Sequence, residues 1–206
     1  MKTSRFARPS VGVGASVGFV TGMLTMAAIV AVVATAPEHS PLPAQAASQV
    51  LAVPVLNASA IAELRHRHLD LPVQSMTHAD VRDSFNEKRG ADRLHEAVDI
   101  LAPRNTPVMA VEDGTVAKLF FSKAGGNTVY QFDPSGIYAY YYAHLERYAD
   151  GLAEGAPIAR GQVIGYVGTS GNAPPNTPHL HFAIFKLTAE KQWWKGAAID
   201  PFQVLR

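Results

Sequence analysis

The spacing of the apolar residues constrains the fold of this chain more than any other feature of its sequence. From about Val73 onward, short runs rich in valine, isoleucine, tyrosine and phenylalanine alternate at close intervals with glycine, proline, asparagine and aspartate. Such spacing is typical of antiparallel strands connected by turns, because each run is long enough for a strand but short for a helix. We therefore expect an all-β domain with few helices.

Turn-forming residues divide this region into strands. A hairpin is expected over Val108–Phe121 around Asp113-Gly114. A second hairpin is expected across Asp133-Pro134-Ser135-Gly136, which has Asp, Pro and Gly at the positions that a type I turn prefers. Further strands are expected over 127–132, 137–145, 162–168 and 179–185. Loops are expected over 150–161 and 169–178.

The N-terminal region has the properties of a membrane segment. Val11–Ala36 is largely apolar, and as a helix it would reach about 39 Å, enough to cross a hydrocarbon core of about 30 Å. The preceding Lys2, Arg5 and Arg8 favour a cytoplasmic N-terminus, which places the rest of the chain on the outer side of the membrane. An uncleaved anchor is favoured, because secretory apolar regions span only about 7 to 15 residues. Cleavage after Ala36 or Ala46 is the alternative, and it would release the chain to the periplasm.

The chain of 206 residues is expected to contain a single core and five segments. Asn57 or Ser59 is expected to cap a short helix that continues through Leu69, with Ile61 and Leu64 on its apolar side. The expected segments are a basic cytoplasmic tail (1–10), a transmembrane anchor or uncleaved signal (11–36), a proline- and alanine-rich spacer (37–56), the short helix with its lead-in (57–80), and the β domain (81–206).

Composition narrows the possible chemistry. The net charge is +1, which provides no basic surface for nucleic acid, so we expect no nucleic-acid partner. The chain has no cysteine, so any bound metal must be held by His, Asp or Glu. His66-Arg67-His68 is expected to be a solvated basic face, because residues two apart on a helix point in different directions.

Four histidines and one aspartate of the β domain form the candidate site: His95 and Asp99, then His144, then His179 and His181. Side chains at positions i and i+2 of a strand project from the same face, so His179 and His181 are expected to share one site. Asp99 lies between two β-branched apolar residues, and a core strand tolerates that carboxylate only if something pairs with it. A divalent cation is a natural partner for this set.

The expected strand over 137–145 carries further candidates. Its alternation places Tyr138, Tyr140, Tyr142 and His144 on one face. Packing is the simpler interpretation of the tyrosines, but Tyr140 and Tyr142 remain candidate substrate contacts because they are near His144.

The loop over 169–178 carries two more candidate substrate contacts, Asn172 and Thr177. Polar loop residues positioned by a rigid sheet commonly contact a substrate.

Two histidines and one aspartate on zinc would form the three-ligand open site typical of catalytic zinc. Zinc lowers the pKa of a bound water to about 7 and also acts as a Lewis acid, and amide hydrolysis is the matching reaction.

Three stretches of the β domain resemble the signature segments of the lysostaphin and LytM peptidoglycan endopeptidases. They are Arg93–Ile100 (RLHEAVDI), Tyr142–Leu145 (YAHL) and Pro178–Phe182 (PHLHF), and they occur in the order found in that family. The similarity extends from about Asp83 to Leu205. It implies a duplicated hybrid motif folded as an antiparallel β-sandwich, in which residues 81–206 form a LytM-type peptidase domain.

The resemblance also implies roles for the candidate residues. By it, His95, Asp99 and His181 are the ligands of one zinc ion per chain, and His144 and His179 are an unligated catalytic pair. His179 would act as general base toward the attacking water, while His144 would stabilise the oxyanion or pass a proton to the leaving amine. The two roles could be exchanged.

The implied function is zinc-dependent hydrolysis of peptide cross-links in bacterial peptidoglycan, by an enzyme anchored in the cytoplasmic membrane with its catalytic domain periplasmic or extracellular. The compartment favours a D-alanyl to diaminopimelate cross-link over a pentaglycine bridge. Other cell-wall enzymes or regulators are further expected partners.

Three departures from the family pattern affect the backbone. The family usually has Gly in the position of Ala97, between the first two ligands, and favours Gly where Asn86 and Asn105 stand. Asn enters the left-handed region more readily than most residues, whereas Ala does so only at a cost. The sequence therefore leaves open whether Ala97 alters the geometry between His95 and Asp99.

The main alternative function is a catalytically idle LytM-like module that binds or activates other cell-wall hydrolases. Such modules typically lack one or more of the five site positions, all of which are present here. A carrier domain of the related hybrid-motif folds is a second alternative, but the Asp-Lys turn that it would modify is missing.

Overall fold

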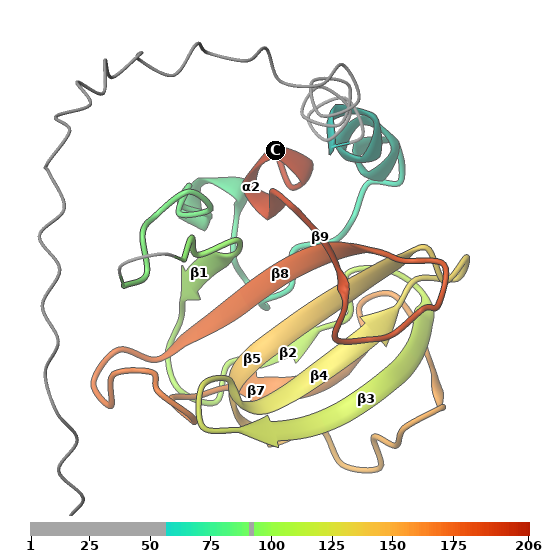
Figure 1. Cartoon of the computed structure of the whole chain (residues 1–206). Coiled ribbons are helices and arrows are strands. Elements are labelled where there is room, and N and C mark those ends of the chain that lie inside the picture. The colour runs from blue at the N-terminus through green and yellow to red at the C-terminus, as the bar shows by residue number, and fades with distance from the viewer. Residues whose placement is uncertain (1–56, 91–92) are drawn as a thin grey trace, which may run out of the picture. The chain divides into compact units, whose positions relative to one another are not determined.

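The computed structural model describes residues 57–90 and 93–206 and confirms a mainly β, antiparallel fold with few helices (Figure 1). The expected anchor and spacer lie outside these residues. The strands are β1 (Val98–Leu101), β2 (Pro107–Met109), β3 (Gly114–Ser122), β4 (Gly126–Phe132), β5 (Tyr138–Tyr148), β6 (Pro157–Ile158), β7 (Val163–Val167), β8 (His179–Leu187) and β9 (Gly196–Ile199). The helical elements are a helix over residues 57–66, the 3-10 helix η1 (His78–Asp80) and α2 (Pro201–Val204).

The strands form one branched sheet. Its main path runs β1-β8-β5-β4-β3-β6, while β9 pairs with β8, and β2 pairs with β7 (Figure 1). The long strand β5 pairs with β8 and β4 through its first part, and with β7 from Leu145 to Tyr148. The expected sandwich therefore takes the form of a single sheet that branches where β5 changes partners.

The β4–β5 hairpin is confirmed. The Gly136 amide donates to the Asp133 carbonyl at 3.0 Å, which closes the turn. The Asp133 carboxylate accepts hydrogen bonds from the amides of Ile137 at 2.7 Å and Tyr138 at 2.8 Å. The turn residues thus fix the register in which β5 leaves the hairpin.

The hairpin expected over Val108–Phe121 is wrong. Strand β2 pairs with β7, whereas β3 pairs with β4 and β6. A Cβ on Gly114 would collide with the carbonyl oxygen of Phe132. The glycine therefore allows β4 to approach closely, and it does not close a turn between paired strands.

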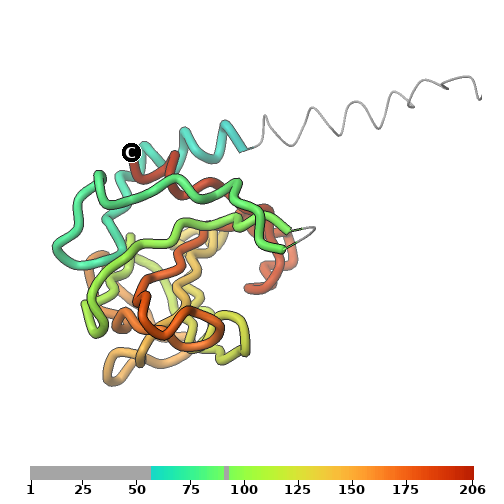
Figure 2. Tube along the Cα trace, turned by 90° about the vertical axis from the view of Figure 1, so that its left-hand side faces the viewer, coloured from blue at the N-terminus to red at the C-terminus, as the bar shows by residue number. Residues whose placement is uncertain are grey.

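The helix over residues 57–66 covers part of the core. Ala60 and Leu64 are buried, and both belong to the same cluster as the β-sheet residues. The helix ends before Leu69, the expected end, because the chain enters the left-handed region at His68 with φ of 51°. Figure 2 shows this helix beside the C-terminal α2, and Ile61 and Gln203 line one small hollow.

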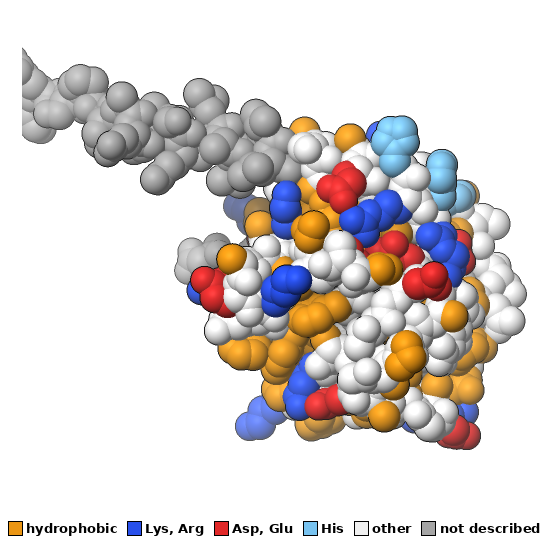
Figure 3. Space-filling model, turned by 90° about the vertical axis from the view of Figure 1, so that its right-hand side faces the viewer, with side chains coloured by type: hydrophobic (Ala, Val, Ile, Leu, Met, Phe, Trp, Pro, Cys, Tyr) orange, Lys and Arg blue, Asp and Glu red, His pale blue; other side chains and the backbone are white. Residues whose placement is uncertain are grey.

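Within residues 57–90 and 93–206, none of the helices combines the length and apolar character needed to span a membrane. On the side of the molecule drawn in Figure 3, acidic and basic side chains lie next to one another.

The expectation for His66-Arg67-His68 holds only for the two histidines, which are exposed. The guanidinium of Arg67 donates to Glu63 at 2.6 Å, to Asp133 at 2.9 Å and to Glu112 at 3.3 Å. Glu112 and Asp133 are buried. Arg67 is therefore the counterion of two buried carboxylates and not part of a solvated basic face.

Candidate metal centre and catalytic groove

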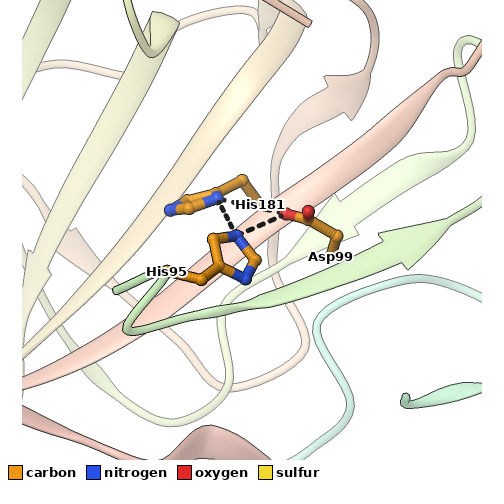
Figure 4. A group of neighbouring side chains, drawn as sticks. All are labelled: His95, Asp99 and His181. Atoms are coloured by element: carbon orange, nitrogen blue, oxygen red, sulfur yellow. Dashed lines mark hydrogen bonds and ion pairs between the residues drawn. The ribbon is translucent and has the colours of Figure 1, made fainter. Parts of the chain in front are cut away.

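Strands β1 and β8 bring three potential metal ligands together (Figure 4). Asp99 pairs directly with His181 across the two strands, and His95 lies just before β1. The Oδ1 atom of Asp99 is 3.0 Å from Nε2 of His95 and 3.1 Å from Nδ1 of His181. The two imidazole nitrogens are 3.0 Å apart. The three potential ligand atoms thus form a nearly equilateral triangle. We call these atoms the metal donors and their arrangement the donor triangle.

Neighbouring groups fix the orientation of these side chains. Nδ1 of His95 lies 3.1 Å from the Ser84 carbonyl oxygen. Because a carbonyl only accepts, Nδ1 carries the proton, and Nε2 directs its lone pair at the other two donors. Arg89 donates to Oδ2 of Asp99 at 2.6 Å, which leaves Oδ1 directed at the histidines. Sequence reasoning missed Arg89, because no local pattern connects it with Asp99.

The protonation states of Asp99 and His181 suit the binding of a metal cation. Burial raises the pKa of Asp99, but the neighbouring rings of His181 and His95 outweigh burial and hold this pKa well below its usual range. Burial lowers the pKa of His181. Near neutral pH the carboxylate is therefore ionised and the His181 imidazole is neutral, which is the protonation that metal binding requires.

His144 and His179 lie together beside the triangle of donors, with ring centroids 4.9 Å apart. Nδ1 of His144 lies 2.8 Å from the Ser170 carbonyl oxygen, and Nδ1 of His179 lies 2.8 Å from that of Thr177. In both rings Nδ1 therefore carries a proton, and the lone pair of the neutral tautomer is on Nε2. Burial lowers the pKa of His144 to about 4, so this ring is neutral near pH 7.

The expected face of His144 is wrong. Tyr140 and Tyr142 are completely buried in the core, whereas His144 lies with His179 in the groove. His144 has a φ of 61°, and the β4–β5 register shifts between Asn127 and Val129. Such a bulge interrupts the alternation of side chains, so His144 turns to the face opposite Tyr142.

A cavity of about 730 Å³ opens over the donors, and its lining includes both loop candidates, Asn172 and Thr177. Tyr140 and Tyr142 are not part of the lining, because they bond inside the core with Glu112 and Gln131, respectively. The tyrosines that line the cavity are Tyr130 and Tyr141, and the ring centroid of Tyr141 is 5.8 Å from that of His181. The expectation that Tyr140 and Tyr142 contact the substrate is therefore not met by this geometry.

Ala97 does not carry the unusual backbone conformation. The positive φ falls on Glu96, at 56°, while Ala97 is completely buried. Asn105 has a φ of 69°, as expected of an asparagine in place of glycine, whereas Asn86 is outside the positive-φ region. Glu96 thus takes the left-handed position between His95 and Asp99.

Close backbone packing holds the loop that positions His144. A Cβ on Gly171 would collide with backbone atoms of Gly126 and Ala124. We expect Gly171→Ala to displace Ser170 and to lower kcat/KM by about 10- to 100-fold, because the His144 ring loses its carbonyl partner. Metal content should be unchanged, since His144 is not among the three donors.

Gly151→Ala is the matched control for this substitution. Both glycines have a φ of 76°, but a Cβ on Gly151 would meet nothing within 4 Å. Peptidase assays and metal analysis of both variants check the prediction, and equal activity of the two variants would contradict it.

Comparison with known proteins agrees with this geometry. An L-Ala–D-Glu endopeptidase of Bacillus subtilis is 34% identical over 151 residues, which cover 68% of this chain and 45% of that protein. The peptidoglycan DD-endopeptidase ShyC of Vibrio cholerae is 35% identical over 107 residues, which cover 50% of this chain and 24% of that protein. The chain therefore spans less than half the length of each relative.

The solved structure of a zinc-containing peptidase from Vibrio cholerae superposes with a TM-score of 0.50 and 25% identity. The superposition covers 66% of this chain and 38% of that chain. The sequence pattern of peptidase family M23 matches residues 93–201, slightly more than half of the chain, and includes all five site residues. This chain belongs to peptidase family M23.

Proposed function

We propose that this chain is a zinc-dependent endopeptidase that hydrolyses peptide cross-links of bacterial peptidoglycan. The observation that carries the proposal is the convergence of His95, Asp99 and His181 beside two further histidines, whose Nδ1 atoms bond to backbone carbonyls and leave Nε2 facing the groove. Family membership and the peptidoglycan DD-endopeptidase among the relatives support the substrate class.

The donor triangle fits zinc. With bonds of about 2.0 to 2.1 Å, the ligand atoms of a tetrahedral zinc site lie about 3.3 Å apart. The three edges of the triangle are 3.0, 3.0 and 3.1 Å, so only a small expansion is needed. Two nitrogens and one carboxylate oxygen are donor types of catalytic zinc sites, and three ligands leave one position open. When bound, zinc would supply the Lewis acidity that activates water and polarises the scissile carbonyl.

His179 is the proposed general base. Its Nε2 atom is 3.9 Å from Oδ1 of Asp99, so it lies next to the donor triangle without joining it. The bond from Nδ1 to the Thr177 carbonyl fixes the ring and leaves Nε2 able to accept a proton from the attacking water. Once protonated, the same nitrogen can donate to the leaving amine.

His144 is the proposed second member of the pair. Its Nδ1 proton is held by the Ser170 carbonyl, so Nε2 of the neutral ring accepts but does not donate. Direct stabilisation of an oxyanion requires a donor. This tautomer therefore fits a role in proton transfer, in which Nε2 of His144 shares the proton that His179 takes up, better than a role in stabilising the oxyanion.

The cleaved bond and the location belong to the same proposal. The two relatives have names that refer to different specificities, an L-Ala–D-Glu endopeptidase in one case and a DD-endopeptidase in the other. We favour the D-alanyl to diaminopimelate cross-link, and a membrane-anchored enzyme that acts outside the cytoplasmic membrane, on the argument from the N-terminal sequence.

Digestion of purified cross-linked muropeptides by the full chain tests the proposed function. We expect monomeric products, identified by mass spectrometry, together with about one zinc per chain. Treatment with EDTA should abolish cleavage, and one equivalent of zinc should restore it. A zinc-loaded chain that binds wall fragments without cutting them would instead be an idle module.

A further inference from the structure

Four aromatic side chains form a platform next to the groove: Phe120, Tyr130, Trp193 and Trp194. The ring of Trp193 lies 5.4 Å from that of Phe120, 4.8 Å from that of Tyr130 and 5.0 Å from that of Trp194, between centroids. Trp194 is 61% exposed and Phe120 is 40% exposed. Exposed aromatic surface of this kind is costly in water and commonly marks a binding site.

This aromatic platform continues the floor of the catalytic cavity. Tyr130 pairs with Tyr141 across β4 and β5, their rings are 4.6 Å apart, and both line the cavity. Ala143, two residues along β5 from Tyr141, pairs with His181, which pairs with Asp99. Because paired and alternate residues share a face, the platform and the metal donors lie on the same face of the sheet.

We infer that the aromatic platform binds sugar rings of the glycan strand that carries the cleaved peptide, an inference that rests on the proposed function. One face of a pyranose ring presents C–H groups, which pack against the negative faces of aromatic rings. At the platform's edge, Lys118 pairs with Tyr130 in the β3–β4 register and bonds to Glu154 at 3.0 Å. These charged groups can bond with the hydroxyl groups of a sugar.

The distance between platform and donors matches the substrate. Neighbouring strands lie about 4.8 Å apart, so β4 and β3 lie about 10 and 14 Å from β8, which carries His181. A peptide of three to four extended residues also spans about 10 to 14 Å. A stem peptide attached to the glycan can therefore reach the donors while its sugar stacks on the platform.

Tryptophan fluorescence tests sugar binding without any need for cleavage. The two tryptophans of the chain, Trp193 and Trp194, both belong to the platform, so their emission reports on this surface. Titration of the full chain with N-acetylglucosamine oligomers is expected to give a saturable change in emission. Phe120→Ala should weaken binding about tenfold.

Phe121→Ala is the matched control for Phe120→Ala. Phe121 is 64% exposed and follows Phe120 on β3, so it projects from the opposite face of the sheet. Sugar binding by this variant should equal that of the unmodified chain. An absent response to the oligomers, or equal losses in both variants, would overturn the inference.

A pair of substrates separates this inference from the proposed function. One substrate is a cross-linked peptide that carries its sugars, and the other is the same peptide without them. Trp194→Ala should lower the ratio of kcat/KM for the sugar-bearing substrate to kcat/KM for the sugar-free substrate about tenfold. An unchanged ratio would overturn the inference, as would a fluorescence response to phospholipid vesicles but not to sugar. If neither substrate is cut, the proposed function fails, while the oligomer titration still decides whether the platform binds sugar.

Discussion

His181→Ala is expected to abolish both zinc binding and peptide cleavage, whereas His179→Ala is expected to keep zinc and lose only cleavage. The two histidines lie two residues apart on β8 and share one face. Nδ1 of His181 is 3.0 Å from Nε2 of His95 and 3.1 Å from Oδ1 of Asp99, so its removal opens the donor triangle. Nε2 of His179 lies 3.9 Å from that oxygen and does not complete the triangle.

The expected magnitudes differ clearly between the two variants. Loss of an outer-shell partner already weakens metal binding about 10- to 100-fold, so loss of the His181 ligand should exceed about 100-fold. Loss of a general base should lower kcat about 10²- to 10⁴-fold at unchanged zinc content. Mass spectrometry of bound zinc and chromatography of muropeptide products measure both effects.

His66→Ala serves as the control, because His66 is exposed on the helix over residues 57–66. Zinc loss in His179→Ala would show that the ligand set is wrong. Cleavage by His179→Ala at the rate of the unmodified chain would show that the assignment of the base is wrong.

Arg67→Met is expected to lower the free energy of unfolding by about 3 to 5 kcal/mol, the usual cost of leaving buried carboxylates without their cation. The guanidinium bonds to Asp133 at 2.9 Å and lies 3.3 Å from Glu112, and both acids are buried. Methionine keeps much of the side-chain length and packing. The loss of unfolding free energy therefore measures the effect of the missing charge. Arg67 lies outside residues 93–201, the segment matched by the M23 family.

Urea denaturation of the zinc-loaded chain measures this effect. Arg65→Met is the matched control, because Arg65 is exposed on the helix that ends just before Arg67 and should change stability by less than about 0.5 kcal/mol. Similar losses in the two variants would contradict the view that Arg67 is the counterion of the two buried acids.

The parts of the structure that local chemistry determines could be predicted from the sequence. The turn at Asp133-Pro134-Ser135-Gly136 was predicted correctly. It forms through local hydrogen bonds, because the Asp133 carboxylate accepts from the amides that follow the turn. His179 and His181 share a face because any strand alternates with a period of two. The convergence of His95, Asp99 and His181 was expected on resemblance and agrees with the described geometry.

The features that the sequence did not predict depend on contacts between residues far apart in the chain. His144 lies in the groove because of a bulge between β4 and β5, where the distant Gly125 carbonyl accepts a hydrogen bond from the His144 amide at 2.8 Å. The residues around Arg67 give no sign of Glu112 or Asp133, which lie 45 and 66 residues away in the sequence. Strand β2 paired with β7 rather than with its neighbour β3, a choice that no local turn signal specifies.

Anomalous diffraction at the zinc edge, recorded from crystals of the zinc-loaded chain, tests the central claim most directly. We predict one peak within about 2.2 Å of Nε2 of His95, Oδ1 of Asp99 and Nδ1 of His181. The same peak should have neither His144 nor His179 within bonding distance. A peak bonded to either of those two histidines, or no peak among the three donors, would contradict the account.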